Sequence, residues 1–460
     1  MDHFVGRRKE LDLLESSFGT PCAFLVYGRR RVGKSTLLKR FCQGKRNIYI
    51  NCIRGLEDIN LRYLADVISN FTGTEHDRYV DYYEAFRDLE RICSEETIVL
   101  VIDEFQYISS VSPEVKSYAQ HLIDNSLDHK GSMVILCGSS VRMMRSLGED
   151  GSDPLFGRFR RMIDLGPLSF GECRMLHPGM SDIDCMRLYL TVGGIPRYHV
   201  EIVQDTYRDC IRKNFLSDGW MTDETENLIM SEFSPGQRYL ATLSAISNGS
   251  VRLKEIAERI GVEESTCSEY IRELEKAGIV SSVNPMKGAP KRRTYYVSDD
   301  MIAFNYEVLV RRSALIGSDR TDEALARLTP YIDTFLGRRF ELFCMRFIIG
   351  NYPVTEIGRW WRDDPRRNVH EDIDIVARMI SGNVRTDLYI ECKFTKEKVG
   401  FHVYNILDSR VSQYMDGGNH RLGFMSVSGF EEDFAEFARD AGILLIGPEE
   451  LFGHRPVPEI

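Results

Sequence analysis

The sequence has no uninterrupted apolar run long enough to span a membrane, because none approaches about 18 residues. Its amino terminus, MDHFVGRRKE, also lacks the apolar core of a secretory signal peptide. The cysteines are scattered, odd in number at 11, and never spaced as Cys-x-x-Cys, so neither a disulfide framework nor a zinc ribbon is indicated. We therefore expect a soluble, cytoplasmic protein with reduced thiols and no membrane partner.

The chain also lacks a positive net charge. The net charge is −10, which argues against wholesale coating of nucleic acid but allows a local basic patch. The 460 residues are 43% hydrophobic and 28% charged, so the chain can bury ordinary hydrophobic cores. Its length favours about three domains.

The most informative stretch is FLVYGRRRVGKSTLL, which covers residues 24–38. An apolar strand runs into a glycine, and G-x-x-x-x-G-K-[ST] then opens a helix, which is the context of a phosphate-binding loop. Backbone N–H groups of such a loop surround phosphate oxygens, its lysine reaches the β- and γ-phosphates, and its serine hydroxyl binds Mg²⁺. The sequence therefore predicts that a nucleoside triphosphate and Mg²⁺ bind here. The expected contacts are Gly28, Arg29, Arg30, Arg31, Val32, Gly33, Lys34, Ser35 and Thr36.

A second buried strand, TIVLVID at residues 97–103, ends in two carboxylates, Asp103 and Glu104. Ligands of parallel sheets bind outside the carboxyl ends of the strands. We expect Asp103 to hold Mg²⁺ through its water shell. We expect Glu104 to orient and polarise the water that attacks the γ-phosphate.

Two further features of this half leave alternatives open. The strand at 133–137 ends in Gly138-Ser139-Ser140, and either serine could contact the γ-phosphate or cap the next helix. Arg158, within PLFGR, is the candidate among five nearby arginines for stabilising the charge of the transition state. The alternative for Arg158 is a solvated surface position.

Two glycine-containing turns flank the predicted nucleotide site. Phe4-Val5-Gly6-Arg7 precedes an amphipathic helix and either wraps the adenine base or lies on the surface. The run GGIPRY at residues 193–198 interrupts a helical region. It either presents its backbone to the nucleotide or is an ordinary turn between helices.

Taken in this order, the runs FVGR, GRRRVGKST, LVIDEFQ, LCGSS, PLFGR and GGIPRY resemble the archaeal ATPases of the AAA+-related signal-transduction class, often called STAND. The resemblance covers about residues 1–235 and implies an ATPase core over 1–168 with a helical lid over 169–235. It implies that ATP hydrolysis drives a conformational switch, and it leaves a homo-oligomer open. The contacts it implies for the adenine, the sensing serine and the lid are Val5, Gly6 and Arg7, Ser139 or Ser140, and Gly194–Pro196.

Residues 236–300 resemble a winged helix. A helix-turn-helix pattern ends at Lys276, and two short strands then flank a basic loop that suits DNA phosphates. The basic residues of that loop are Lys287, Lys291, Arg292 and Arg293. The supposed recognition helix is acidic, with Glu269, Glu273 and Glu275, which disfavours reading of DNA sequence. Contact with double-stranded DNA and a role as a protein-contact or lid module both stay open.

A helical connector over 301–330 leads to the last predicted domain, 331–460, which opens with a helix over 335–349. The apolar strands IDIVA and LYIECKF are predicted to form a hairpin. Alternation puts Glu391 and Lys393 on one face of the second strand, and Asp374 can point to the same side. Two carboxylates and the Cys392 carbonyl could hold Mg²⁺, while Lys393 orients water or stabilises charge.

The spacing of Asp374, Glu391 and Lys393 is similar to the PD-(D/E)xK pattern of restriction-endonuclease-like proteins, with Ile373 in place of the usual proline. This region also resembles an uncharacterised domain that accompanies archaeal ATPases. The resemblance implies an α/β nuclease-like fold, with Glu341 as an additional acidic residue at the metal.

The expected fold class is α/β: a P-loop parallel sheet with a helical lid, a winged helix and a restriction-endonuclease-like domain. Two functions follow. The first is an ATP-regulated nuclease acting on DNA, with arginines and tryptophans near residue 360 as nucleic-acid contacts or a solvated loop. The second is a non-enzymatic ATP switch in which Asp374, Glu391 and Lys393 only pair with one another.

Overall fold

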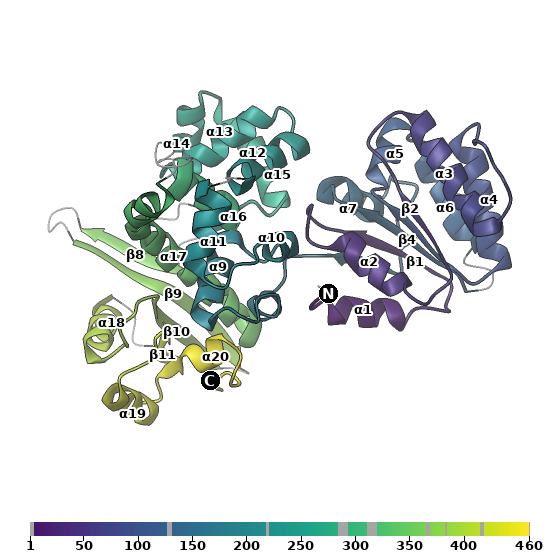
Figure 1. Cartoon of the computed structure of the whole chain (residues 1–460). Coiled ribbons are helices and arrows are strands. Elements are labelled where there is room, and N and C mark those ends of the chain that lie inside the picture. Colours follow the sequence, from purple (N-terminus) through teal and green to yellow (C-terminus); the bar gives the residue numbers. More distant parts are fainter. Residues whose placement is uncertain are drawn as a thin grey trace. The chain divides into compact units, whose positions relative to one another are not determined.

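The computed structural model describes residues 4–126, 131–217, 220–283, 293–310, 320–364, 369–381, 384–414 and 418–459. The chain divides into two compact units, whose elements are labelled in Figure 1. The first unit runs to Glu172 and also includes residues 194–201. The second consists of residues 173–193 and everything from Ile202 onward.

The first unit is built on a parallel five-stranded sheet with the order β2-β3-β4-β1-β5. Its strands are β1 (Cys22–Tyr27), β2 (Asn47–Asn51), β3 (Val99–Asp103), β4 (Met133–Gly138) and β5 (Arg161–Asp164). The strands β1, β3 and β4 are buried along their whole length. Burial on both faces explains why these strands are continuous apolar runs with no alternation of polar residues. The predicted α/β class is confirmed for this unit.

Helices cover both faces of this sheet (Figure 1). One face packs against α3 (Glu57–Thr72), α4 (Tyr82–Glu95) and α6 (Val115–Ser126) in a single apolar cluster. The other face carries α1 (Arg8–Glu15) and α2 (Lys34–Cys42). The shorter helices of the unit are α5 (Gln106–Val111), α7 (Val141–Glu149) and α10 (Pro196–Glu201). None of the described helices is long and apolar enough to cross a membrane.

The second unit begins with helices and a winged helix. The helical part holds α8 (Phe170–Arg174, which straddles the two units), α9 (Asp182–Val192), α11 (Tyr207–Ile211), η1 (Arg212–Ser217) and α12 (Trp220–Glu232). The winged helix holds α13 (Gly236–Ser247), α14 (Leu253–Ile260), α15 (Glu264–Lys276), β6 (Val280–Val283) and β7 (Thr294–Val297). Antiparallel pairing of β6 with β7 confirms the predicted wing strands. Lys287, Lys291 and Arg292 lie outside the described residues, and Arg293 pairs with Glu275 at 2.5 Å.

The winged helix is followed by α16 (Asp300–Phe304), η2 (Asn305–Leu309) and α17 (Thr321–Asn351). The sequence predicts a helix that starts only at Phe335, but α17 runs unbroken through Pro330, so the expected boundary at residue 330 falls inside a helix. A proline removes one backbone donor and normally ends or kinks a helix. Here Leu328 and Ile332, on either side of Pro330, are both buried, and this packing stabilises the continuous helix.

The middle of α17 is fixed to the end of the winged helix and to α16 by a buried ion pair and hydrogen bonds. Arg339, only 4% exposed, donates from Nε to Oδ1 of Asp300 at 2.6 Å. The same guanidinium donates to the carbonyls of Val297 and Ser298, both at 2.8 Å. A charge this deep is stable only because every donor has a partner. The pair therefore joins the last strand of the winged helix to the helix that leads into the next sheet.

That next sheet has the order β12-β11-β10-β9-β8. Its strands are β8 (Val354–Asp364), β9 (Val369–Ser381), β10 (Val384–Lys393), β11 (His420–Ser426) and β12 (Leu444–Ile446). The helix α18 (Phe401–Tyr414) precedes β11, α19 (Glu432–Asp440) precedes β12, and α20 (Pro448–Leu451) follows β12. The pairs β8–β9 and β9–β10 are antiparallel, which confirms the predicted hairpin, and β10–β11 and β11–β12 are parallel. The tip of the hairpin, residues 382–383, lies outside the described residues.

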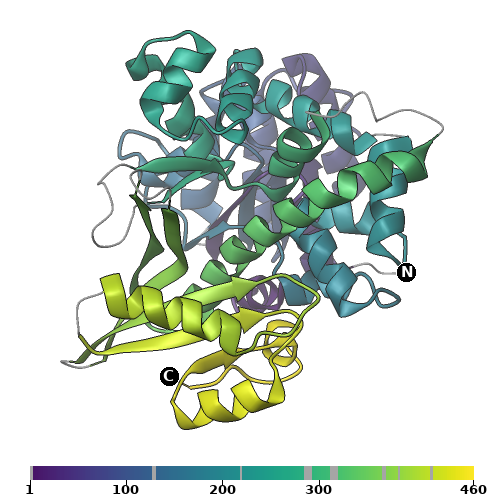
Figure 2. The ribbon, with the colours of Figure 1, turned by 90° about the vertical axis from the view of Figure 1, so that its left-hand side faces the viewer.

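Both faces of this mixed sheet are covered (Figure 2). Leu407 of α18 and Phe434 of α19 pack on one face in a cluster with Phe424. On the other face, Phe340 of α17 contacts Phe394, with ring centroids 5.2 Å apart. The sheet is therefore the middle layer between α17 and the pair α18 and α19.

Candidate functional site

The predicted nucleotide site lies at the carboxyl ends of three neighbouring strands. In the order β3-β4-β1, these ends carry Asp103 and Glu104, then Ser139, then the phosphate loop that follows Tyr27. Crossover connections of a parallel sheet place such ends along one edge, where ligands bind. Residues more than 60 positions apart in the sequence are brought within hydrogen-bond distance there.

Ser35 and Asp103 meet directly. The Ser35 hydroxyl donates to Oδ2 of Asp103 at 2.6 Å, and the Tyr49 hydroxyl donates to the same oxygen at 2.6 Å. Asp103 is 1% exposed, so both bonds are shielded from water. Burial and the neighbouring Asp103 carboxylate raise the pKa of Tyr49 well above its usual range, which keeps it a donor. A hydroxyl and a carboxylate oxygen at this spacing suit an oxygen-preferring cation such as Mg²⁺.

Glu104 is held by a second pair of donors. The Ser139 hydroxyl donates to Oε2 of Glu104 at 2.7 Å, and the Gln106 amide donates to the same oxygen. Glu104 adopts a φ of 56°, a left-handed conformation that is uncommon for residues other than glycine and is enriched at functional sites. Its N–H donates to Oδ1 of Asp103 at 2.9 Å. Of the two candidate serines, Ser139 contacts Glu104, whereas Ser140 occupies the N-cap of α7.

The phosphate loop has the backbone that its glycines permit. Gly33 caps α2 with a φ of +92°, and a Cβ at Gly28 would lie 2.3 Å from the carbonyl oxygen of Leu165. Lys34, 5% exposed, donates from Nζ to the carbonyls of Gly28 at 2.9 Å and Arg29 at 3.0 Å. Its ammonium group therefore lies within the loop formed by the residues that precede it.

The two flanking turns lie against this loop. The side chain of Arg7 donates to the carbonyl of Val32 at 2.9 Å and to that of Gly166 at 2.6 Å. The Pro196 ring is 3.8 Å from the position that a Cβ on Gly33 would occupy. Both turns therefore lie beside the loop. The alternatives of a surface helix and an ordinary interhelical turn would have allowed them to lie away from it.

The carboxylate of Glu172 holds the Arg7 turn in place. The N–H of Arg7 donates to Glu172 at 3.1 Å, and the N–H of Ser169 donates at 2.8 Å. Burial by itself would raise the pKa of Glu172, but these hydrogen bonds outweigh it and lower the pKa, so the carboxylate stays ionised. Gly6 is required beside it, because a Cβ there would lie 2.2 Å from a carboxylate oxygen.

The remaining residues expected at the nucleotide occupy the rim of the loop. Arg30 donates to the hydroxyl of Tyr107 at 2.9 Å. Arg31 and Thr36 are exposed, and Val5 is half-buried.

Arg158 is not brought to the loop of its own chain. It pairs with Asp124, from Nε to Oδ1 at 2.9 Å, and donates to the carbonyl of Pro154. Two residues later, Arg160 bonds to Ala23 at the amino end of β1, whereas the phosphate loop follows the carboxyl end at Tyr27. At about 3.3 Å per residue the two ends of this strand are separated by about 13 Å. Arg158 is therefore away from the phosphate loop of its own chain, and its role at a nucleotide stays a prediction.

A second group of charged residues lies where β9 and β10 pair. The N–H of Cys392 donates to Oδ2 of Asp374 at 2.8 Å, and Nζ of Lys393 lies 2.6 Å from Oε1 of Glu391. Cys392 and Phe394 face α17, whereas Glu391 faces Arg410 of α18, with 3.8 Å between charged atoms. The predicted alternation along this strand is confirmed.

Burial and a neighbouring carboxylate perturb Asp374. Burial and the negative charge of Glu391 raise the pKa of Asp374 to about 7, despite the Cys392 hydrogen bond and the nearby charges of Lys393 and Arg359. Oε2 of Glu391 is buried and has no hydrogen-bond partner among the described residues. Closely spaced carboxylates with an oxygen left without a donor are chemically suited to a divalent cation.

Glu341 is not part of this group. Its carboxylate pairs with the guanidinium of Arg359, and α17 lies on the face of the sheet away from Arg410. Within the described residues, no cluster of three or more acidic, histidine or cysteine side chains has the geometry of a metal site. The expectation that Glu341 joins Asp374 and Glu391 is wrong, because Arg359 neutralises it first.

Several residues that shape these sites carry no signal in the sequence. Tyr49 and Arg410 lie on other elements and reach Asp103 and Glu391 only through the tertiary fold. Gln106 was within reach of sequence reasoning, because it lies two residues after Glu104 in the run DEFQ.

Comparison with known proteins identifies the domains. A family described as an ATPase domain predominantly from Archaea matches residues 4–202. A winged helix-turn-helix DNA-binding family matches residues 240–281, and a family of archaeal and bacterial proteins of unknown function matches residues 305–403. The solved Walker-type ATPase of Pyrococcus abyssi has the same fold, with a TM-score of 0.51 and 22% identity, over 66% of this chain and 96% of that one.

Two curated relatives come from Methanocaldococcus jannaschii. An uncharacterized protein is 26% identical over 403 residues, which is 85% of this chain and 87% of the relative. An uncharacterized ATP-binding protein is 47% identical over 45 residues, which is 9% of this chain and 76% of the relative.

The phosphate loop, the carboxylates at the end of β3 and the matching ATPase family define a P-loop ATPase that uses ATP. The chain belongs to the predominantly archaeal family of these ATPases and carries a winged helix after the ATPase domain.

Proposed function

We propose that this ATPase is a molecular switch that acts on DNA and whose carboxyl-terminal sheet cleaves phosphodiester bonds with a divalent cation, under control of the bound nucleotide. The observation that carries the proposal is the pair of half-buried Asp374 and buried Glu391 on adjacent strands, with Lys393 beside Glu391. Burial and the negative charge of Glu391 raise the pKa of Asp374 to about 7. Residues with perturbed pKa values are concentrated at functional sites. The match of the motif spacing to the PD-(D/E)xK pattern supports the same conclusion.

In the ATPase unit, Lys34 binds the β- and γ-phosphates, and Ser35 and Asp103 hold Mg²⁺. Glu104 accepts a proton from the attacking water while Ser139 fixes the carboxylate that does so. The turn at Val5, Gly6 and Arg7 contacts the adenine, and Pro196 closes over Gly33. These roles rest on the contacts within the loop and on the resemblance of the motifs. The edge of the sheet where these residues meet suits a nucleotide with its metal.

A role for Arg158 in catalysis requires a second copy of the chain. Its position at the amino end of β1 puts it beyond reach of the loop in the same chain. In a homo-oligomer it completes the site of a neighbour, as arginines supplied in trans do in phosphoryl transfer. This requirement is the reason that we include self-association in the proposal.

Asp374 and Glu391 fit a divalent cation, because Oε2 of Glu391 accepts no hydrogen bond from the described residues. Such a cation supplies neutralisation of phosphate charge and activation of water. Burial lowers the pKa of Lys393, but the facing Glu391 carboxylate outweighs burial and raises it. Lys393 is therefore a cation that stabilises the charge developing on the phosphate during cleavage.

The connection between nucleotide and DNA passes through Gly193 and Gly194, where the chain crosses between the two units. Gly193 has φ 69° and ψ −162°, a conformation that is nearly exclusive to glycine. A Cβ there would lie 3.2 Å from Oδ2 of Asp300, the residue that Arg339 binds. We propose that a shift of Pro196 on the phosphate loop rotates this glycine pair and reaches α17 through Asp300.

The second candidate function, a switch without nuclease activity, is favoured by the ion pairs around the same carboxylates. Glu391 already faces both Lys393 and Arg410. If these pairs persist in the presence of divalent ions, the sheet binds a partner and does not cleave. DNA contact by the winged helix belongs to both candidates.

The proposal is tested with Lys393→Ala. We expect Mg²⁺- or Mn²⁺-dependent cleavage of DNA to fall on the order of a hundredfold or more, because one charged stabiliser of the transition state is lost. ATP turnover should be unchanged. Lys396→Ala is the matched control, since this lysine lies three residues further on and is exposed. Equal cleavage by Lys393→Ala and by the control would refute nuclease activity at this site.

A further inference from the structure

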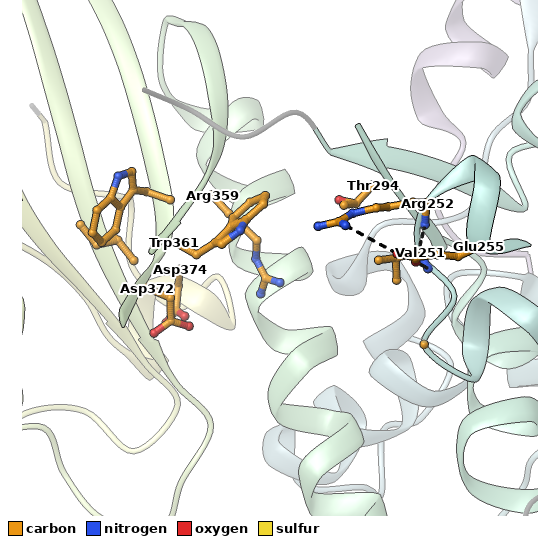
Figure 3. Close-up of a pocket in the computed structure, with 11 residues that line it drawn as sticks. Val251, Arg252, Glu255, Thr294, Arg359, Trp361, Asp372 and Asp374 are labelled. Atoms are coloured by element: carbon orange, nitrogen blue, oxygen red, sulfur yellow. Dashed lines mark hydrogen bonds and ion pairs between the residues drawn. The ribbon is translucent and has the colours of Figure 1, made fainter. Parts of the chain in front are cut away.

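A cavity of about 470 Å³ lies inside the second unit, between the winged helix and the carboxyl-terminal sheet (Figure 3). The winged helix contributes Arg252 from the start of α14 and Thr294 from β7. The sheet contributes Arg359 and Trp361 from β8, and Asp374 with its neighbour Asp372 from β9. This volume is that of a small-molecule site and is far too small for a double helix.

Trp361 gives the cavity an aromatic wall. Its neighbour Trp360 is 5% exposed and stacks on Tyr414 of α18, with ring centroids 5.3 Å apart, so that indole belongs to the core. The next residue of a strand points the other way, and Trp361 is accordingly only half-buried. Figure 3 shows its indole projecting from β8 toward the side of the cavity that carries Arg252 and Thr294.

The cavity carries more carboxylates than arginines, so it can accept a negatively charged phosphate only together with a cation. Arg252 and Arg359 face the carboxylates of Glu255, Asp372 and Asp374, and Arg359 also pairs with Glu341 outside the cavity lining. Arg252 lies 3.6 Å from Glu255, and Arg410 of α18 lies 3.7 Å from Asp372. The Nε of Arg359 is buried with no hydrogen-bond partner among the described residues. A divalent cation at Asp374 would offset this excess of negative charge, so that phosphate and cation enter together.

We propose that this cavity holds one unstacked nucleotide of a DNA strand, with its base against Trp361 and its phosphate between Arg359 and Asp374. An aromatic face accepts any base, and the neighbouring arginine supplies the backbone contact, which is the usual composition of sites for single-stranded nucleic acid. Thr294 and Arg252 lie across from the indole and contact the sugar or the next phosphate. The winged helix and the sheet therefore bind the same strand.

This inference rests on the proposed function in taking DNA as the partner and a divalent cation at Asp374, and binding of the nucleotide does not require cleavage. It assigns to the winged helix a task that differs from insertion of α15 into a groove. The acidic residues of α15 are then of no consequence, because α14 and β7 line the cavity instead. The substrate is a strand end, a flap or an unpaired position, where a nucleotide can leave the stack at little cost.

The test measures the affinity of the full-length chain for two probes: a blunt DNA duplex, and the same duplex with a short thymidine overhang at either end. Lys393→Ala serves as the parent, so that cleavage does not disturb the binding measurement. Fluorescence anisotropy with Ca²⁺ gives each dissociation constant. We expect the overhang duplex to bind more tightly than the blunt duplex, and EDTA to remove the difference.

Added to this parent, Trp361→Ala should weaken binding of the overhang duplex by about 5- to 150-fold, the range for loss of one base–aromatic stack. Binding of the blunt duplex should not change. Trp361→Phe keeps an aromatic face and should retain most of the affinity, which separates stacking from loss of fold. Arg252→Ala should weaken overhang binding as well, whereas Arg259→Ala, at an exposed position of the same helix, should not.

Equal affinity of Trp361→Ala and its parent for the overhang duplex would overturn the proposal, as would an equal loss on both probes. Tighter binding of an RNA overhang than of the DNA overhang would overturn the assignment to DNA. Selective overhang binding without cleavage by the wild-type chain supports the cavity and refutes the nuclease. Cleavage by the wild-type chain that is unaffected by Trp361→Ala supports the nuclease and refutes the cavity as its binding site.

Discussion

Glu104→Gln is expected to slow ATP hydrolysis by about 10²- to 10⁴-fold while ATP binding is retained. A glutamine cannot accept the proton of the attacking water, but its carbonyl can still accept the Ser139 hydroxyl hydrogen bond that holds Glu104. The left-handed backbone at this position is also unchanged by the substitution. Phosphate release and the affinity for a fluorescent ATP analogue are the two readouts.

Two further variants serve as controls for Glu104→Gln. Lys34→Ala should lose ATP binding itself, because the ammonium group inside the loop is removed. Glu114→Gln, at an exposed position, should behave as the wild-type chain. Normal turnover by Glu104→Gln would remove Glu104 from the catalytic role, and loss of ATP binding would make it a structural residue of the loop.

Asp374→Asn is expected to abolish binding of a divalent cation at the carboxyl-terminal sheet and to lower DNA cleavage on the order of a thousandfold or more. Asparagine has the same shape and can still accept the Cys392 N–H, so the strand pairing survives. It removes the carboxylate whose pKa burial and Glu391 raise, and a neutral amide is a weak ligand for Mg²⁺.

Thermal unfolding without nucleotide reports this loss independently of cleavage. A cation at a hundred times its dissociation constant stabilises the folded chain by about 2.7 kcal/mol. We expect Mn²⁺ to raise the melting temperature of the wild-type chain and of the exposed control Asp440→Asn, but not that of Asp374→Asn. An equal rise in all three proteins would contradict a cation site at Asp374.

The sequence was sufficient for features in which chemistry is local. A phosphate loop is a contiguous run between a strand and a helix, so its position and the parallel sheet behind it were predictable. The hairpin of β9 and β10 was predictable for a similar reason, because alternation orders Glu391 and Lys393 on one face. Even the contact of Ser35 with Asp103, between distant residues, follows from the rule that ligands meet at the carboxyl ends of strands.

The errors arose where tertiary packing decided the outcome. Pro330 indicated a break, yet buried residues on both sides keep α17 continuous. The sequence left open which chain Arg158 serves, and only the fold shows that it lies near the amino end of β1, away from its own phosphate loop. Glu341 had the right charge and helix, and only the fold shows that Arg359 pairs with it. No pattern within one element reports such a partner.

The central claim is that the nucleotide on the phosphate loop controls chemistry at the carboxyl-terminal sheet. Its most direct test is the rate of Mg²⁺-dependent DNA cleavage with ATP, with ADP and without nucleotide, for the wild-type chain, Lys34→Ala and the exposed control Lys9→Ala. We expect ATP to change the wild-type and control rates at least about fivefold, the lower end of typical coupling between sites. Lys34→Ala should keep the nucleotide-free rate and lose the effect of ATP. A wild-type rate that is the same in all three nucleotide states would contradict the account.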